Sequence, residues 1–383
     1  MSRHAWDDER RARAEWSGLV EPGDQAAGAL VRLLGAARAL DWVVAATRGA
    51  PEWSALPGLD GPDRARLVGA ARRWSERGVS LDVGAWAAQL GGLGGSLVVP
   101  GDESWPAGLD DLGDAAPFAL WCRGALPAGA SVAIVGSRAS TAYGERVAFD
   151  LADGLVGRGV AVVSGGAYGI DAAAHRGAQA GGGPTVVVLA GGVDRTYPMG
   201  NARLFEELVA AGGAILAELP PGSLPTKSRF LQRNRLIAAI TGATVVVEAA
   251  WRSGALSTAR RAAELLRPVG AVPGPVTSVA SAGCHRLLRE GCAVCVTDAP
   301  EVVELLPGAA AVDEPAGSPD DLAALGPIAV RVHDALGLRA GADLDLVARR
   351  AGTTVDEARS ALGLMELKGL VVRGSGGWRA VRP

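Results

Sequence analysis

The chain has 383 residues, of which 49% are hydrophobic and 21% are charged, and its formal net charge is −3. This length and hydrophobic content support two or three domains with their own cores. The slight acidity counts mildly against a nucleic-acid binder but does not exclude a local basic patch. No apolar run reaches the roughly 18 residues of a membrane helix, four cysteines are too few for a disulfide framework, and the charged start lacks a signal sequence, so we expect a cytoplasmic protein.

Residues 1–95 are expected to form a small helical domain. A Pro-Gly-Asp turn at 22–24 predicts the start of a helical run that continues to about Leu40, and a second helix is predicted over Gly61–Arg77. Six of the ten tryptophans lie in this part of the chain. Because tryptophan side chains bury large apolar areas, we interpret them as the core of this domain.

Residues 96–306 have the pattern of an α/β domain. After a proline-rich leading segment with an edge strand predicted at Phe118–Arg123, short apolar runs without alternation are separated by helical patterns. Such runs are typical of strands buried on both faces. The expected strands are Val132–Val135, Val160–Val163, Thr185–Leu189, Ala214–Ala217, Thr244–Val247, Val269–Val272 and Ala293–Val296. The alternation predicts a doubly wound, mostly parallel sheet.

Turns of small residues follow the first two of these strands. They comprise Gly136, Ser137 and Arg138 after the first, and Ser164, Gly165, Gly166 and Ala167 after the second. Small residues at the carboxyl edge of a parallel sheet leave backbone N–H groups available to anions, above all phosphates. The alternative, that the glycines only make tight turns, stays open. The G-x-G-x-x-G fingerprint is absent, so no dinucleotide cofactor is expected.

A basic segment at 225–239 is the second informative stretch. Between Lys227 and Arg235 it contains four cations and no carboxylate, and Phe230, one of only four phenylalanines, lies among them. Cations next to an exposed ring suit single-stranded nucleic acid, because the charges hold phosphates while the ring stacks on a base. The alternative is a solvated helix start whose Phe230 packs inward.

The rest of the chain is predicted to consist of a linker and a small domain. Residues 307–325 are rich in Pro, Ala, Gly and Asp, which is typical of a flexible acidic linker. Residues 326–383 predict three helices followed by a hairpin, the pattern of a winged helix, with a generic helical domain as the alternative. The expected elements are helices at Pro327–Leu336, Leu344–Ala351 and Thr354–Lys368, and strands at Val371–Arg373 and Trp378–Val381.

Two further constellations were weighed for chemistry. Cys292 and Cys295 are three apart on a predicted strand, so their side chains face opposite ways and are expected to be buried rather than to bind a metal. Ser164, Asp171 and His175 offer the residue types of a catalytic triad. Because Asp171 and His175 are neighbours on one helix face, a structural role explains them without a substrate.

Several motifs occur together in a recognisable order. They are GSR at 136–138, SGGAYGIDAAAH at 164–175, AGGVDRTYP at 190–198, K-x-x-F at 227–230, RNRLIA at 233–238 and VVEAAWRSGALSTA at 246–259. Together they resemble the bacterial DNA-processing protein family called DprA or Smf. The resemblance covers about residues 97–305, and the flanking domains are compatible with it.

This resemblance implies an extended Rossmann-like domain that binds single-stranded DNA. Members of the family protect incoming strands during natural transformation, help to load the RecA recombinase, and act as dimers through the Rossmann domain. For this chain, we expect a homodimer that uses apolar segments at 269–275 and 282–293. No catalytic residue, metal or cofactor is expected, so the chain is predicted not to be an enzyme.

The resemblance also implies a DNA site. Arg138 and Lys227 would contact the DNA backbone, and Phe230 would stack on a base. The other expected site residues are Gly136 and Ser137 beside Arg138, the backbone of Gly165, Gly166 and Ala167, Arg233 in the basic cluster, and Asn234, which would order a loop or reach the strand. The rival function is a nucleotide-hydrolysing enzyme of the lysine-decarboxylase-like Rossmann group, although the glutamate of that group's motif is missing here.

Overall fold

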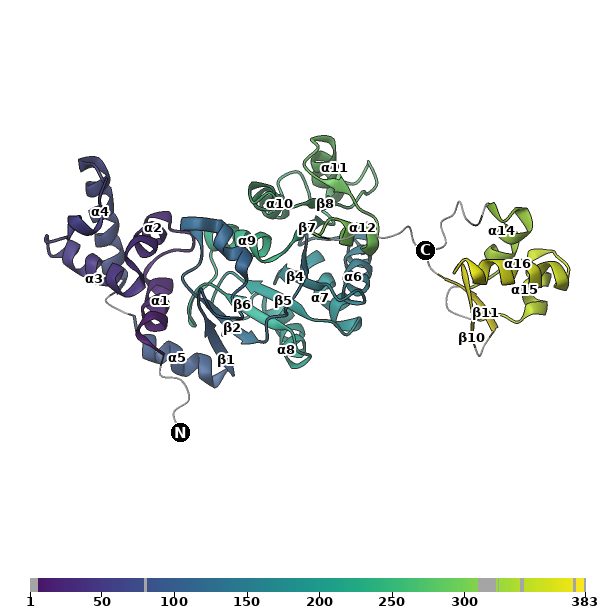
Figure 1. Ribbon diagram of the computed structural model, residues 1–383, viewed down its shortest axis with the longest axis horizontal. Coiled ribbons are helices and arrows are strands. Elements are labelled where there is room, and N and C mark those ends of the chain that lie inside the picture. Colours follow the sequence, from purple (N-terminus) through teal and green to yellow (C-terminus); the bar gives the residue numbers. More distant parts are fainter. Residues whose placement is uncertain are drawn as a thin grey trace. The chain divides into compact units, whose positions relative to one another are not determined.

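The computed structural model describes residues 6–78, 81–308, 322, 324–337, 341–374 and 377–381. They belong to two compact units, Met1–Gly308 and Ala309–Pro383 (Figure 1). Most of the predicted linker at 307–325 lies outside the described residues. None of the described helices is long and apolar enough to cross a lipid bilayer.

The first unit begins with a helical layer built around tryptophans. Its helices are α1 (Asp8–Leu19), α2 (Gln25–Leu34), α3 (Ala36–Thr47), α4 (Gly61–Gly78) and α5 (Val83–Gly92), with a short 3-10 turn η1 (Trp53–Ala55). The predicted helical run to Leu40 is wrong in one respect: it breaks at Gly35, whose φ of 81° is incompatible with a continuous helix. Trp16 is fully buried and packs on Trp74 and Phe118, so tryptophans do supply this core.

The same unit contains a nine-stranded sheet in the order β1-β2-β6-β5-β4-β3-β7-β8-β9. The strands are β1 (Gly95–Val98), β2 (Leu120–Gly124), β3 (Ser131–Val135), β4 (Ala161–Gly165), β5 (Thr185–Leu189), β6 (Ala214–Ala217), β7 (Ala243–Val246), β8 (Val269–Ala271) and β9 (Val294–Cys295). In this spatial order, every pair of neighbouring strands from β6 through β5, β4, β3, β7 and β8 to β9 is parallel, as predicted. The β2 strand is not at the edge, because β1 pairs antiparallel with its outer side.

Helices cover both faces of this sheet. They are α6 (Ala142–Val156), α7 (Ile170–Ala180), α8 (Ala202–Ala210), α9 (Lys227–Ile240), α10 (Ala255–Glu264), α11 (Ala282–Arg289) and α12 (Ala299–Glu304), with 3-10 segments η2 (Ala107–Ala115), η3 (Met199–Asn201) and η4 (Val279–Ser281). Along β5, Val186 and Val188 belong to the buried cluster on the face covered by α9, whereas Val187 and Leu189 belong to the cluster that includes residues of α8. This two-sided burial explains why the strand sequences are continuously apolar.

The expected burial of the cysteines near β9 is wrong. Cys292 and Cys295 are both exposed, because β9 is the last strand of the sheet and Val294 and Cys295 are left open to solvent. The first proposed dimer segment is also wrong in part, since Val269, Ala271 and Val272 are buried within the sheet layer.

The second unit is a winged helix. Its elements are α14 (Pro327–Asp334), α15 (Leu344–Ala351), α16 (Val355–Leu367), β10 (Val371–Gly374) and β11 (Gly377–Ala380), and the two strands pair antiparallel. Gly352 ends α15 in the left-handed conformation, as a turn between two helices requires. Thr354 and Glu357 form a capping box that starts α16.

Candidate nucleic-acid interface

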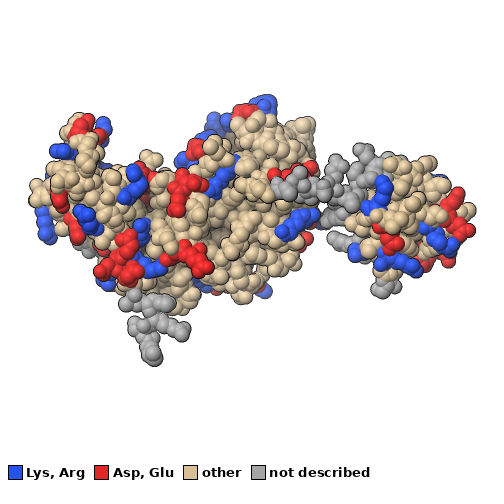
Figure 2. All heavy atoms as spheres, viewed as in Figure 1, with Lys and Arg blue, Asp and Glu red and all other residues tan. Residues whose placement is uncertain are grey.

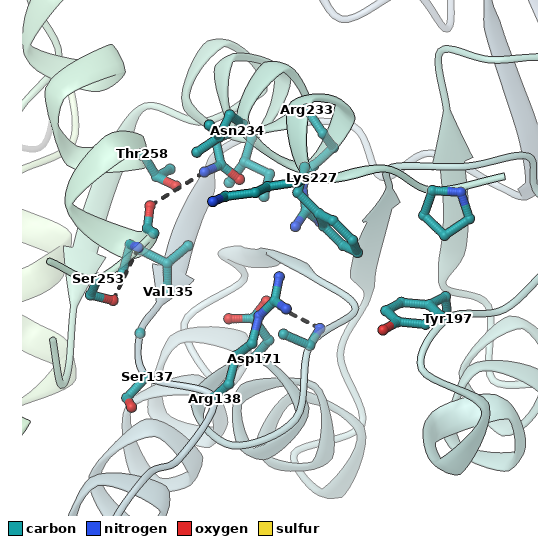
Figure 3. A pocket seen from close by; sticks show the side chains of 18 of the residues that line it. Val135, Ser137, Arg138, Asp171, Tyr197, Lys227, Arg233, Asn234, Ser253 and Thr258 are labelled. Carbon is teal, nitrogen blue, oxygen red and sulfur yellow. Dashed lines mark hydrogen bonds between the residues drawn. The ribbon is translucent and has the colours of Figure 1, made fainter. Parts of the chain in front are cut away.

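A crevice opens where the strand order of the sheet reverses. The chain runs from β3 outward through β4, β5 and β6, and then returns to the other side of β3 as β7. The loops after β3 and β7 therefore diverge, and ligands bind at such a point in open α/β sheets. A pocket of about 690 Å³ lies there, lined by these two loops and by the first turns of α9 (Figure 3).

Phe230 and Arg138 face one another in this pocket. The Arg138 Cζ lies 4.7 Å from the centroid of the Phe230 ring, and the Tyr197 ring centroid lies 5.7 Å away at a tilt. Phe230 is half-buried and lines the pocket instead of joining the buried core. The inward-packing alternative for Phe230 is therefore not what the structure has.

Lys227 extends from the first turn of α9 into the same space (Figure 3). It is exposed, and no ion pair joins it to any described residue. The other cations of the basic segment are engaged elsewhere: Arg229 with Glu21, and the buried Arg235 with Glu218 at 2.6 Å. The free positive charge at the pocket mouth therefore comes from Lys227 and Arg138.

Arg233 forms the floor of the pocket. It is buried, and its Nη1 donates a hydrogen bond to the Val188 carbonyl. Burial lowers the pKa of Arg233 to about 10, an effect that the negative charge of Asp171 opposes. Burial raises the pKa of the Asp171 carboxyl, against the attraction of Arg233. Arg233 therefore supplies a fixed charge below the Phe230 ring, 5.9 Å from its centroid.

Gly165 and Gly166 lie behind the pocket wall, whereas Gly136, Ser137 and Ala167 line it. A Cβ at Gly165 would collide with the Arg233 guanidinium and the Asp171 carboxylate, and one at Gly166 would press on Phe205 and the Tyr197 carbonyl. The missing side chain at Gly165 lets the charged groups of Arg233 and Asp171 approach the sheet, and the one at Gly166 leaves room for the Phe205 ring. The Ala167 N–H donates to Asp171, so it is not free for an anion (Figure 3).

Three residues that the sequence did not single out hold the pocket loops. Glu248 accepts hydrogen bonds from the Thr141 N–H at 2.9 Å and from its hydroxyl at 2.6 Å, which fixes the loop after β3. Asn201 donates to the carbonyls of Gly166 and Ala167. Tyr197 stands beside Phe230. Tyr197 and Glu248 lie within the motifs that carry the family resemblance, and this was the sequence signal that could have identified them as site residues. Asn201 lies outside those motifs.

Of the two roles expected for Asn234, the structure has the one in which it orders a loop. It is buried, and its Nδ2 donates to the Gly254 carbonyl at 3.3 Å, which ties α9 to the loop before α10 (Figure 3). The Asn234 side chain also lines the pocket. It therefore orders the side of the crevice formed by α9 and the loop after β7.

Ser164, Asp171 and His175 are not arranged as a triad. The Ser164 hydroxyl donates to the Ile134 carbonyl, and the His175 ring bonds the Thr185 hydroxyl and the Gly165 carbonyl, so both are structural. Burial lowers the pKa of His175 to about 4. This imidazole is therefore neutral near pH 7.

The chain is similar to known DNA-processing proteins along most of its length. The family model described as "DNA recombination-mediator protein A" matches residues 96–307, and the DprA winged helix domain matches residues 315–377. A Mycobacterium tuberculosis protein that carries the DprA name is 42% identical over 98% of this chain and 95% of its own length. Protein Smf of Escherichia coli is 38% identical over 70% of this chain and 72% of its own length.

Two solved structures share the fold. The X-ray structure of DNA processing protein A from Streptococcus pneumoniae has a TM-score of 0.60 and 30% identity, and the match covers 77% of this chain and 96% of that one. A structure of DNA processing protein A from Helicobacter pylori, reported for its single-stranded DNA binding mode, has a TM-score of 0.50 and 30% identity, over 55% of this chain and 94% of that one.

Proposed function

Because this chain belongs to the DprA (Smf) family of DNA-processing proteins, we propose that it binds single-stranded DNA in the crevice between the loops after β3 and β7. The observation that carries the proposal is the arrangement of Arg138, Phe230 and Lys227 around one pocket. Two exposed cations and a half-buried ring that line the same pocket provide phosphate contacts and a stacking surface for one strand.

The recessed position of Phe230 supports a preference for single strands. The ring is half-buried beneath Arg138 and Tyr197, so only an unstacked base can enter the pocket and lie against it. Bases in a duplex are stacked on their neighbours, and moving one out costs a few kcal/mol, on the order given for flipped bases. Single strands do not carry that cost.

We further propose that the protein acts in the cytoplasm, where it shields incoming single strands during natural transformation and helps to load RecA onto them. The support is family membership. In this role the protein is a binding protein and not an enzyme: Asp171 is the one carboxylate among the described pocket-lining residues, and it already accepts the Ala167 N–H beside Arg233.

A homodimer is part of the proposal. Exposed apolar side chains near the β9 end of the sheet offer surface for it: Val276, Val279 and Val294 are 90%, 77% and 58% exposed. Exposed apolar side chains are costly in water and are typical of interaction sites where they form a contiguous patch. Light scattering at micromolar concentration is expected to give twice the chain mass, and a monomer with and without DNA would contradict the dimer.

The test of the proposed function is fluorescence anisotropy with one labelled oligonucleotide, presented single-stranded and as a duplex. We expect tighter binding of the single strand, and a loss of affinity in Lys227→Ala. The matched control is Arg176→Ala, since Arg176 is an exposed cation on α7 that does not line the pocket. Equal affinity for the two DNA forms, or nucleotide hydrolysis by the purified chain that Asp171→Asn abolishes, would contradict the proposal.

A further inference from the structure

A second hollow of about 680 Å³ adjoins the Phe230 pocket. The two share Lys227, Leu231, Ser253 and Gly254 as lining residues, so they are neighbours. The hydrogen bond from Asn234 to the Gly254 carbonyl holds the shared loop in place. A strand that leaves the first pocket past Lys227 therefore enters the second hollow directly.

The second hollow has its own exposed aromatic side chain. Trp251, in the loop after β7, is 51% exposed, whereas every other described tryptophan is buried or half-buried. The Arg286 Cζ lies 5.2 Å from the centroid of its ring. Exposed aromatic surface is unfavourable in water, whereas a ring held by a neighbouring cation and open to solvent is suited to stacking on a base.

The charges around Trp251 are available for phosphates. Arg252 and Arg260 line the hollow, are exposed, and form no ion pair with any described residue. Arg261 and Arg286 also line it, but they pair with Glu264 and Glu290 on their own helices. Figure 2 shows basic side chains gathered over α10 and α11, the helices that border this hollow. Among the described residues that line the hollow, none carries a carboxylate.

We propose that this hollow is a second nucleotide subsite, in which Trp251 stacks on a base while Arg252 and Arg260 contact phosphates. The subsite extends the path of the single strand beyond Phe230, with Lys227 at the junction. It rests on the proposed single-stranded DNA binding, and it adds a stacking position and two phosphate contacts. The ligand class is a single strand long enough to span both hollows.

The test compares oligothymidylates that lengthen by one nucleotide at a time. For the parent protein, affinity is expected to rise in two stages as the strand fills the first and then the second hollow. In Trp251→Ala the second stage is lost, which weakens binding of the longer strands by about 5- to 100-fold and leaves the shortest strands unaffected. Trp251→Phe is expected to restore most of the loss, because it keeps a ring.

The charge contacts are tested by salt dependence. Arg252→Ala and Arg260→Ala should each flatten the plot of log affinity against log salt by about 0.7 for long strands, while Arg176→Ala should leave it unchanged. If Trp251→Ala binds every length as tightly as the parent, although Phe230→Ala binds weakly, the second subsite is wrong and the proposed function stands. If the parent binds no single strand at any length, the proposed function itself fails.

Discussion

The guanidinium of Arg138 lies over the ring of Phe230, with its Cζ 4.7 Å from the ring centroid. This contact joins the loop after β3 to the first turn of α9 across the mouth of the crevice. It combines a cation and an aromatic ring in one cation–π contact, two groups that single-strand sites use to hold phosphates and to stack on bases.

Removing either exposed cation should weaken binding mainly through the electrostatic contribution. Arg138→Ala and Lys227→Ala are each expected to flatten the slope of log affinity against log salt by about 0.7, the value for one phosphate on a single strand. Anisotropy titrations over a series of salt concentrations measure this slope. Parent-like affinity of both variants at every salt concentration would place the DNA elsewhere.

Replacing Phe230 should remove stacking without changing the salt slope. Phe230→Ala is expected to cost about 1–3 kcal/mol of binding free energy, because stacking releases no counterions. Phe230→Trp is the matched control, since it retains an aromatic face. Thermal unfolding must accompany the titrations: a core phenylalanine would cost about 3–5 kcal/mol of stability on truncation. A variant that melts early yet binds normally would refute the stacking role.

Gly165 should not tolerate a methyl group. In Gly165→Ala the added Cβ would collide with the Arg233 guanidinium and the Asp171 carboxylate, so both stability and DNA affinity should fall. Gly91→Ala is the control, because Gly91 lies in α5 with open space around its Cα and helical alanine is favoured over glycine by about 0.5–1 kcal/mol. Differential scanning fluorimetry of the two variants checks the contrast, and equal melting temperatures would count against a tightly packed pocket floor.

His175 should make the stability of the first unit depend on pH. Its pKa is about 4 in the folded chain against an ordinary value of 6.5. Between these values the unfolded chain binds the proton and the folded chain does not, so the free energy of unfolding falls as pH decreases, by up to about 1.4 kcal/mol per pH unit. Above pH 6.5 this contribution is constant.

Urea unfolding followed by tryptophan fluorescence measures this effect, because every tryptophan except Trp378 belongs to the first unit. His175→Gln removes the titrating group and is expected to reduce the pH dependence between pH 4 and 6.5. If the parent and His175→Gln lose stability equally on acidification, another group is responsible.

The sequence predicted the parallel strands well because each is a short apolar run buried on both faces. The run Val186–Val188 shows why: neighbouring residues face opposite sides of the sheet, and each side is covered by a hydrophobic core. No alternation of apolar and polar residues therefore remains. The edges were harder to predict. Cys295 lies on an apolar strand that reads as buried, yet β9 ends the sheet and leaves its side chains exposed.

The site was predicted in part. The sequence does not distinguish three cations of the basic segment, Lys227, Arg229 and Arg233. Only the fold shows which of them is exposed, which is paired and which is buried. Arg229 pairs with Glu21, a partner some 200 residues away that no local pattern reveals, and Arg233 is buried in the pocket floor. Lys227 is exposed, and no carboxylate of the described residues forms an ion pair with it. The support from Asn201 and Glu248 likewise depends on contacts between segments distant in sequence.

The most direct test of the account is to locate the DNA on the protein. Photo-cross-linking of the full chain with a single strand that carries 5-iodouridine, followed by mass spectrometry, identifies aromatic side chains next to bases. The account predicts a main cross-link at Phe230 or Tyr197, which disappears when unlabelled single strand competes and persists when duplex does. Cross-links confined to the winged helix, with none at the crevice, would contradict it.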